Sequence, residues 1–233
     1  MKNFVICHDA LLVSRASKSL SGLGADTTWV MVGDKDFGDL VNDPDVIVAR
    51  FLPDNIEHRK ELCSFTAWYA LVKNGFIEDD VFYGLFEYDI KVCSNFVERV
   101  LPTLSKNRVI GFERSQVYSF LFANRQVVNF VSGFMDLYGI DVFDVVGKEL
   151  DLGRILWCPS TNVVISGFNL KCFVNWIMPF FDTVGYDKSN AFIPERALRI
   201  WMALYNINPI LVKGVLKHFM SVSHDISWDV KIQ

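Results

Sequence analysis

Short apolar runs alternate with stretches of helical spacing along the first half of the chain. Runs of three or four apolar residues closed by polar residues or glycine are typical of buried strands, whereas recurrence every three to four residues is typical of a helix. The pattern predicts strands at residues 4–7, 29–32, 46–48, 81–90 and 108–112. It predicts helices at 62–73, after a chain break at Pro53, and at 97–104.

The second half continues the alternation with fewer strands. A strand is expected at 162–165, an apolar stripe of helical spacing follows at 170–177, and Pro194 opens a helix at 195–205. Alternating strands and helices imply a mostly parallel sheet flanked by helices, so the predicted fold class is α/β. The chain has no internal repeat and no Pro/Gly/Ser linker, which predicts a single domain over residues 1–233.

Ligands of such sheets bind beyond the carboxyl ends of the strands. His8 and Asp9 follow the first predicted strand, and Gly33 and Asp34 follow the second. Asp34 is suited to bind a base or ribose, although an ordinary turn acid fits equally well. The first strand is not followed by G-x-G-x-x-G, and the chain has no G-x-x-x-x-G-K-[ST]. These absences argue against a dinucleotide oxidoreductase and a P-loop NTPase.

The composition limits the classes of partner that this chain is expected to bind. The chain has 233 residues, of which 51% are hydrophobic, and its net charge is −4 without any basic block. Binding to DNA or RNA phosphates usually needs a basic stripe, so no sequence-specific nucleic acid is expected as a partner. The 20 phenylalanines predict either a large core or an apolar surface patch for a partner or a membrane face.

The cysteines and the first residues of the chain indicate the cellular compartment in which the protein is expected. The five cysteines are widely spaced, and no pair has C-x-x-C spacing. Such a set is typical of reduced core residues. His8 and Asp9 interrupt the first apolar run too early for a signal-peptide core, and no run is long enough to span a membrane. We therefore expect a cytoplasmic protein.

An acidic motif lies at the end of the fourth predicted strand. Glu87 and Asp89 are two residues apart, so on a strand their side chains point the same way. Two carboxylates on one side form a hard-oxygen site for Mn²⁺ or Mg²⁺. A cation there would stabilise the diphosphate that leaves a nucleotide-sugar donor. The alternative is an acidic pair on a solvated surface.

Four segments carry a family resemblance. Residues 66–74 resemble the T-A-x-Y-x-x-x-K-N helix of the capsular-polysaccharide and lipopolysaccharide glycosyltransferase-like family, and residues 83–88 resemble its Y-x-G-L-x-H-Y strand. Residues 162–165 and 195–201 are similar to its N-M-F-I strand and E-R-L-L-x-I-W helix. The chain departs from the family at Ser64 and at residues 87–89, where its sequence instead resembles the D-x-D motif of metal-dependent glycosyltransferases.

The resemblance implies a divergent glycosyltransferase with a single-domain GT-A-type, Rossmann-like fold. Residues 1–110 would then form the half that binds the nucleotide sugar, and residues 111–233 the acceptor side. The donor would be a nucleotide-diphosphate sugar, and the acceptor a hydroxyl of a glycan, a lipid-linked molecule or another compound. The rival interpretations are a non-catalytic binding or scaffolding protein that keeps the fold, and a nucleotidyltransferase.

The resemblance also suggests roles for individual residues. Glu195 would act as general base on the acceptor hydroxyl, with simple helix capping as the alternative. His224 would join the two acids as a metal ligand, unless it is a surface histidine near the chain end. The candidates for donor binding are His8, Asp9, Asp34, Lys73, Tyr88 and Arg196. Lys73 would otherwise serve as the cation at the C-terminal end of its helix.

Overall fold

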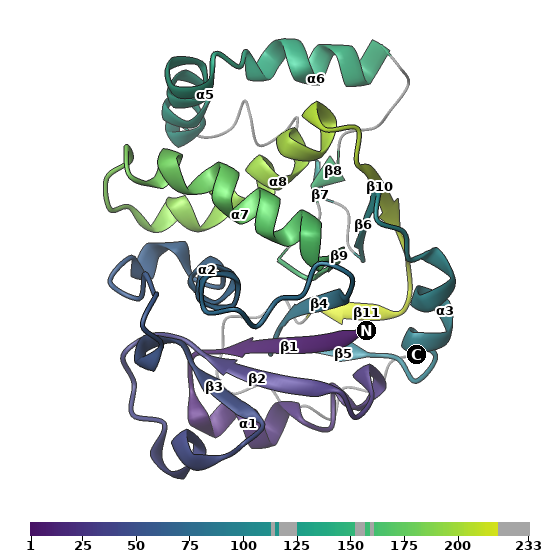
Figure 1. Ribbon diagram of the computed structural model, residues 1–233. Coiled ribbons are helices and arrows are strands. Elements are labelled where there is room, and N and C mark those ends of the chain that lie inside the picture. Colours follow the sequence, from purple (N-terminus) through teal and green to yellow (C-terminus); the bar gives the residue numbers. More distant parts are fainter. Residues whose placement is uncertain (113–114, 117–124, 152–156, 159–160, 219–233) are drawn as a thin grey trace.

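A seven-stranded sheet forms the centre of the molecule. The computed structural model describes residues 1–112, 115–116, 125–151, 157–158 and 161–218 (Figure 1). The strand order is β10-β6-β9-β4-β1-β2-β3. Its members are β1 (Lys2–Cys7), β2 (Thr27–Met31), β3 (Val46–Val48), β4 (Phe82–Glu87), β6 (Arg108–Gly111), β9 (Val163–Ser166) and β10 (Asn208–Leu211).

One strand runs against the others in this sheet. β3, β2, β1 and β4 pair in parallel, as do β10 and β6, whereas β9 is antiparallel to both of its neighbours. The predicted α/β class with a mostly parallel sheet is confirmed. Two short antiparallel ladders lie outside the sheet, joining β5 (Ile90–Val92) to β11 (Leu216–His218) and β7 (Ser115–Gln116) to β8 (Trp157–Cys158).

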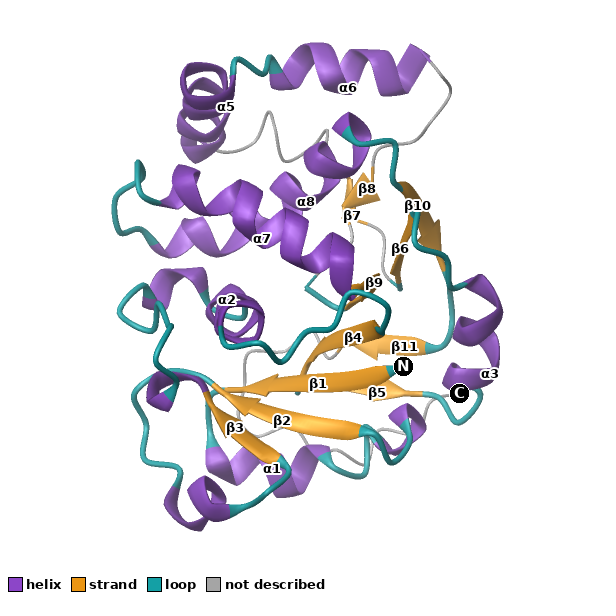
Figure 2. Cartoon of the chain, in the orientation of Figure 1, coloured by secondary structure: helices purple, strands orange, loops and turns teal. Residues whose placement is uncertain are grey.

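Side-chain alternation along β1 divides the core into two layers. Phe4 and Ile6 pack on one face with α2 (Phe65–Lys73), α7 (Gly167–Phe181) and α8 (Ile193–Leu204). Val5 and Cys7 pack on the other, toward α1 (Ala10–Ala16), α3 (Phe96–Val100) and the β5–β11 ladder. Figure 2 shows α5 (Arg125–Tyr138) and α6 (Val142–Asp151) as a further layer outside α7 and α8.

Several predicted boundaries are wrong by a few residues. The expected helix at 62–73 begins only at Phe65, because Cys63 has a φ of 47° that interrupts the helical path after a 3₁₀ turn at Lys60–Leu62. The expected strand at 81–90 ends at Glu87, and the chain turns before β5 begins. The expected helix at 97–104 changes from α to 3₁₀ geometry at Leu101–Thr103, beside Pro102.

Both sequence halves contribute to the sheet. β9, from the second half, lies between β4 and β6, and β10 forms the edge beyond β6. The assignment of residues 1–110 to the donor and 111–233 to the acceptor stays a prediction. Within the described part of the chain, no helix combines the length and the apolar character needed to cross a membrane.

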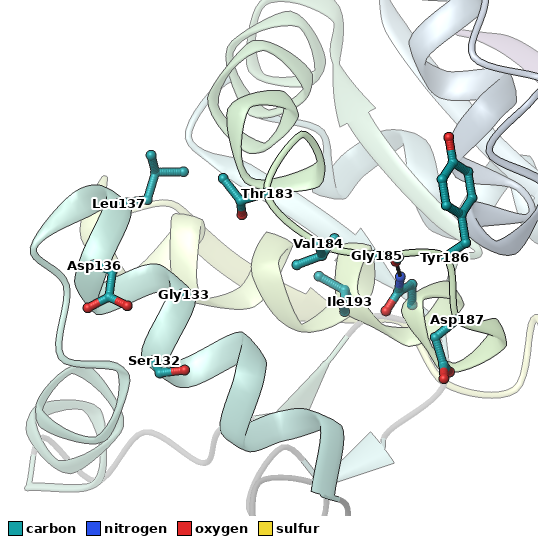
Figure 3. Close-up of a pocket in the computed structure, with 11 residues that line it drawn as sticks. Ser132, Gly133, Asp136, Leu137, Thr183, Val184, Gly185, Tyr186, Asp187 and Ile193 are labelled. Carbon is teal, nitrogen blue, oxygen red and sulfur yellow. Dashed lines mark hydrogen bonds between the residues drawn. The ribbon is translucent and has the colours of Figure 1, made fainter.

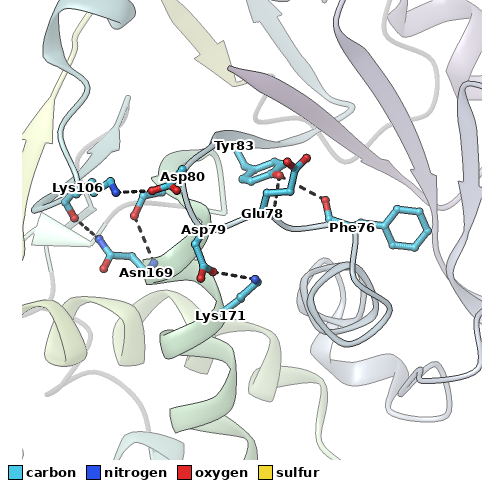
Figure 4. A network of polar contacts seen from close by, with 9 residues as sticks. Phe76, Glu78, Asp79, Asp80, Tyr83, Lys106, Asn169 and Lys171 are labelled. Carbon is cyan, nitrogen blue, oxygen red and sulfur yellow. Dashed lines mark hydrogen bonds and ion pairs between the residues drawn. The ribbon is translucent and has the colours of Figure 1, made fainter.

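The turn before β4 lies at the opposite end of this strand from the acidic motif, and ion pairs hold it in place. Glu78, Asp79 and Asp80 form ion pairs with Lys2, Lys171 and Lys106, respectively, and Figure 4 shows the pairs of Asp79 and Asp80. Exposed pairs of this kind contribute only ~0–1 kcal/mol each. Backbone contacts add to them, because the Gly167 N–H donates to the Val81 carbonyl at 2.8 Å. The start of α7 and the start of β4 are thus held together.

Candidate functional site

The strand order creates a switch point beside β1. From β1 the chain passes to β2 and β3 on one side, then returns to β4 on the other side of β1. Connections therefore diverge from the carboxyl ends of β1 and β4, where open α/β sheets bind their ligands. A pocket of about 490 Å³ lies there. Its walls come from the ends of β1, β2 and β4 and from the segment 57–66.

The acidic motif lies in this pocket. Glu87 is the last residue of β4 and Asp89 lies in the turn that follows, and both line the cavity. The Glu87 N–H donates to Oδ1 of the buried Asn162 at 2.8 Å, and its Oε1 accepts from the Ser64 hydroxyl at 2.6 Å. Glu87 is therefore positioned from β9 on one side and from the start of α2 on the other.

Two carboxylates supply only part of the coordination shell of a divalent cation. Mg²⁺ commonly takes one or two protein carboxylates and completes its shell with substrate phosphates and water. Among the described residues, no cluster of three or more His, Cys, Asp or Glu side chains could hold a metal by itself. His224 lies outside the described residues. Metal binding by Glu87, Asp89 and His224 stays a prediction.

Two aromatic side chains meet beside the acids. The rings of His8 and Tyr88 pack edge to face with their centroids 5.2 Å apart, and both residues line the pocket. Burial raises the pKa of Tyr88 to about 12, and the nearby Asp89 carboxylate adds to this shift. The Tyr88 hydroxyl is therefore protonated at neutral pH and able to donate a hydrogen bond.

The thiol at the end of β1 is buried. Burial raises the pKa of Cys7 to about 11, although hydrogen bonding to the Asp9 backbone opposes the shift. A thiol with this pKa is almost entirely protonated at pH 7. Cys7 therefore lines the pocket as a small apolar group and is not activated as a nucleophile.

Asp34 and Lys60 face each other at the pocket. The Lys60 Nζ lies 2.5 Å from Asp34 Oδ2, and both side chains are largely exposed. The hydrogen bond from Lys60 holds the pKa of Asp34 below its ordinary value. Lys60 is the only Lys or Arg among the described residues that line this pocket. Among these residues it is therefore the one suited to meet an anionic group.

Asp9 and Lys73, two of the predicted donor ligands, lie outside the pocket lining. Asp9 caps α1 by accepting from the Leu11 N–H at 3.0 Å, and it pairs with Lys35 at 2.6 Å. Lys73 is the last residue of α2, roughly 12 Å along the helix from the end that lines the pocket. Its Nζ donates to the Asn175 side chain at 2.7 Å. The structure thus places both residues in local structural contacts.

Glu195 and Arg196 occupy the first turn of α8. They form an ion pair with each other, and their side chains are only 16% and 11% exposed. The Arg196 guanidinium also lies 5.3 Å from the centroid of the Phe192 ring. Neither residue lines the pocket at the strand ends. The catalytic role of Glu195 and the donor contact of Arg196 stay predictions.

Glu57 also lines this pocket and was not predicted from the sequence. Its Oε2 accepts from the Gly33 N–H at the end of β2, and its own N–H donates to Asn55 Oδ1 at 3.2 Å. Its Oε1 is buried and has no hydrogen-bond partner among the described residues. The Pro53–Asn55 break signalled a turn here, but the contact with Gly33 spans 24 residues and left no sequence pattern.

No family model matches the chain, and no curated protein matches it. Among solved structures, the chain is similar to the bifunctional glycosyltransferase WbbM in its apo form, with a TM-score of 0.58 and 11% identity. The match covers 95% of this chain but 45% of WbbM, so the chain spans less than half of that protein. A second match is the galactosyltransferase LgtC in complex with donor and acceptor sugar analogs, with a TM-score of 0.43, 14% identity, and coverage of 91% and 73%. The similarity to WbbM shows a shared fold, in agreement with the predicted GT-A-type fold class.

Proposed function

We propose that this protein transfers a sugar from a nucleotide-diphosphate donor to a hydroxyl acceptor with the help of Mn²⁺ or Mg²⁺. The observation that carries the proposal is the pocket at the β1–β4 switch point, where Glu87 and Asp89 leave a buried strand and line one cavity. The fold shared with WbbM supports the proposal, although at 11% identity the likeness concerns the fold alone.

The pocket groups would share the work of donor binding. His8 and Tyr88 offer aromatic surface and hydrogen-bonding groups to a nucleoside, and Asp34 offers a carboxylate to its hydroxyls. Lys60 would meet the diphosphate charge. A divalent cation held by Glu87 and Asp89 would neutralise the leaving diphosphate. Ser64 and Asn162 keep Glu87 in one orientation, so less ordering is needed when the donor binds.

Transfer to the acceptor hydroxyl needs a base that takes up the hydroxyl proton. As the acceptor oxygen bonds to the anomeric carbon, the bond from that carbon to the diphosphate oxygen breaks, and the hydroxyl proton must leave. We assign this proton to Glu195, as the sequence suggested. Its carboxylate is paired with Arg196. The ion pair would have to separate, or leave one carboxylate oxygen within reach of the hydroxyl, for the proton to be transferred.

A thermal-shift panel of nucleotide sugars with and without Mn²⁺ tests the proposal. A donor present at about 100 times its Kd stabilises the folded state by ~2.7 kcal/mol, or roughly 5–10 °C for a chain of this length. We expect such a shift for the wild type only when Mn²⁺ is present. The double variant Glu87→Ala/Asp89→Ala should lose it.

The matched control changes two acids at the other end of β4. Asp79→Ala/Asp80→Ala removes exposed carboxylates whose ion pairs lie far from the pocket. This control should keep the Mn²⁺-dependent shift at nearly wild-type size. A panel in which no nucleotide stabilises the wild type, or in which both double variants respond alike, would contradict the proposal.

A further inference from the structure

A second pocket lies away from the strand ends, between α5 and the start of α8. Its volume is about 570 Å³. One wall is the C-terminal part of α5, and the other is the loop 183–187 with the first residues that lead into α8 (Figure 3). Of the residues that the structure describes, none lines both this pocket and the one at the strand ends. It is therefore a separate site.

The lining has the chemistry of a site for a neutral, hydroxyl-rich molecule. Asp136 and Asp187 supply carboxylates, Ser132 and Thr183 supply hydroxyls, and Tyr186 supplies an aromatic ring. Carboxylates and hydroxyls hydrogen-bond sugar hydroxyls, and an aromatic face packs against the C–H groups of a sugar ring. None of the described residues that line this pocket is Lys, Arg or His. This part of the lining therefore offers no side-chain cation to a phosphate or a nucleotide.

The loop that forms one wall is held in place by its own contacts. The Asn190 side chain donates to the Gly185 carbonyl at 2.6 Å, and the Asn190 backbone N–H donates to the Asp187 carbonyl at 2.9 Å. The Thr183 hydroxyl donates to the Phe180 carbonyl at 2.7 Å. A wall fixed in this way loses little conformational freedom when a ligand binds.

Arg59 connects this loop to the pocket at the strand ends. Its guanidinium donates to the carbonyls of Phe181 at 2.6 Å and Val184 at 3.3 Å, and it lies 4.8 Å from the centroid of the Tyr186 ring. The Tyr186 side chain nevertheless remains exposed, with 72% of the residue accessible. The next residue in the chain, Lys60, lines the pocket at the strand ends. Neighbouring residues of the chain thus contact the loop of one pocket and line the other pocket.

We infer that the pocket between α5 and the 183–187 loop binds a neutral oligosaccharide, as the site that holds the acceptor chain during transfer. This inference rests on the proposed function for its role in the reaction. The binding itself rests on the lining, and it is measurable without any donor. The two substrates are assigned to the two pockets by their cations. Lys60 and the cation proposed at Glu87 and Asp89 would meet the diphosphate in the pocket at the strand ends, whereas the described lining here has no cation.

Binding of the purified protein to an array of neutral oligosaccharides tests the inference. We expect the wild type to be retained by one class of glycan. Tyr186→Ala and Asp136→Asn, which change opposite walls, should each weaken binding by roughly two- to tenfold. Tyr205→Ala is the matched control, because Tyr205 is also exposed, at 56%, and does not line the pocket. The inference is overturned if no glycan retains the wild type, or if all four proteins are retained equally.

The thermal shift with nucleotide and Mn²⁺ is measured on the same four proteins. Unchanged nucleotide shifts beside weakened glycan binding show that the two sites are separate, as inferred. Glycan binding that depends on Tyr186 and Asp136 without any nucleotide shift would refute the proposed transfer but leave the oligosaccharide site standing. Nucleotide shifts lost together with glycan binding would overturn the separation of the two sites.

Discussion

Tyr88 lies beside two carboxylates, and its surroundings set how the protein responds to alkali. In the folded state burial and the nearby acids raise its pKa from 10.0 to about 12. Above pH 10 the unfolded chain therefore releases this proton while the folded chain still holds it. The contribution of Tyr88 to the free energy of unfolding is complete below pH 10 and decreases as pH rises toward 12.

Melting temperatures measured between pH 9 and 12 check this effect. Tyr88→Phe removes the titrating hydroxyl, so its melting temperature should fall less steeply over this range than that of the wild type. Tyr205→Phe, at an exposed position outside the pocket, should follow the wild-type curve. A Tyr88→Phe curve parallel to the wild type would mean that the Tyr88 hydroxyl is not buried beside the acids in solution.

Glu195 is the residue whose proposed role needs the most direct kinetic test. General-base assistance is typically worth ~10²–10⁴ in rate. Glu195→Gln should therefore reduce kcat by about that factor while donor affinity barely changes. Glu98→Gln makes the same replacement in the first turn of α3, on the exposed surface, and should leave kcat unchanged.

Other outcomes would reassign Glu195. Equal loss of donor binding would place it in the nucleotide site or make the pair with Arg196 a structural element of α8. Full activity of Glu195→Gln would exclude it as the base. Asp187, which lines the pocket between α5 and α8, would then be the next candidate.

At the scale of single residues, the sequence pattern predicted local features better than it predicted contacts between residues far apart in the chain. The spacing of Glu87 and Asp89 indicated a shared direction, and both do line one pocket, although Asp89 lies in the turn beyond the strand. The partners of Glu87 were not predictable, because Ser64 and Asn162 lie 23 and 75 residues away in sequence. The same holds for Glu57, whose contact with Gly33 depends on how two loops fold over β2.

At the scale of elements, the turn before β4 packs closely against the start of α7. A Cβ added at Gly167 would lie 2.0 Å from the Glu78 carbonyl oxygen, which is a backbone atom. Gly167→Ala must therefore displace α7 or the turn. Overpacking typically costs ~1–3 kcal/mol, which corresponds to a decrease in melting temperature of roughly 2–12 °C.

Gly147→Ala is the control for this prediction. Gly147 lies inside α6, and a Cβ added there would meet no atom of the described residues within 4 Å apart from its own helix backbone and chain neighbours. Because alanine favours a helix over glycine by ~1 kcal/mol, this variant should melt at or slightly above the wild-type temperature. If both variants melt with the wild type, α7 does not pack against the turn as closely as the structure indicates.

Elements with a strong apolar period were predictable, and their ends were less so. The buried face of α7, with Leu170, Phe173, Val174 and Ile177, was visible as a helical stripe. The start of α2 was not, because the apolar spacing continues through Leu62 while Cys63 breaks the backbone. Side-chain spacing carries no information on that φ angle, so the pattern placed the helix start three residues too early.

At the scale of the whole molecule, the strand order explains why residues far apart in sequence meet at one site. The alternation of elements predicted the parallel sheet, but it could not show that β9 lies between β4 and β6. That insertion brings Asn162 to the backbone of Glu87. It also carries the chain from β9 into α7, which supports the wall of the second pocket. The two proposed substrate sites therefore depend on one sheet.

The position of a bound Mn²⁺ tests the central claim most directly. Crystals grown with Mn²⁺ and the nucleoside diphosphate that gives the largest thermal shift would be measured at the manganese absorption edge. The proposal predicts an anomalous peak between the carboxylates of Glu87 and Asp89, with the diphosphate oxygens completing the coordination. An anomalous peak elsewhere, or a nucleotide bound away from the ends of β1 and β4, would contradict it.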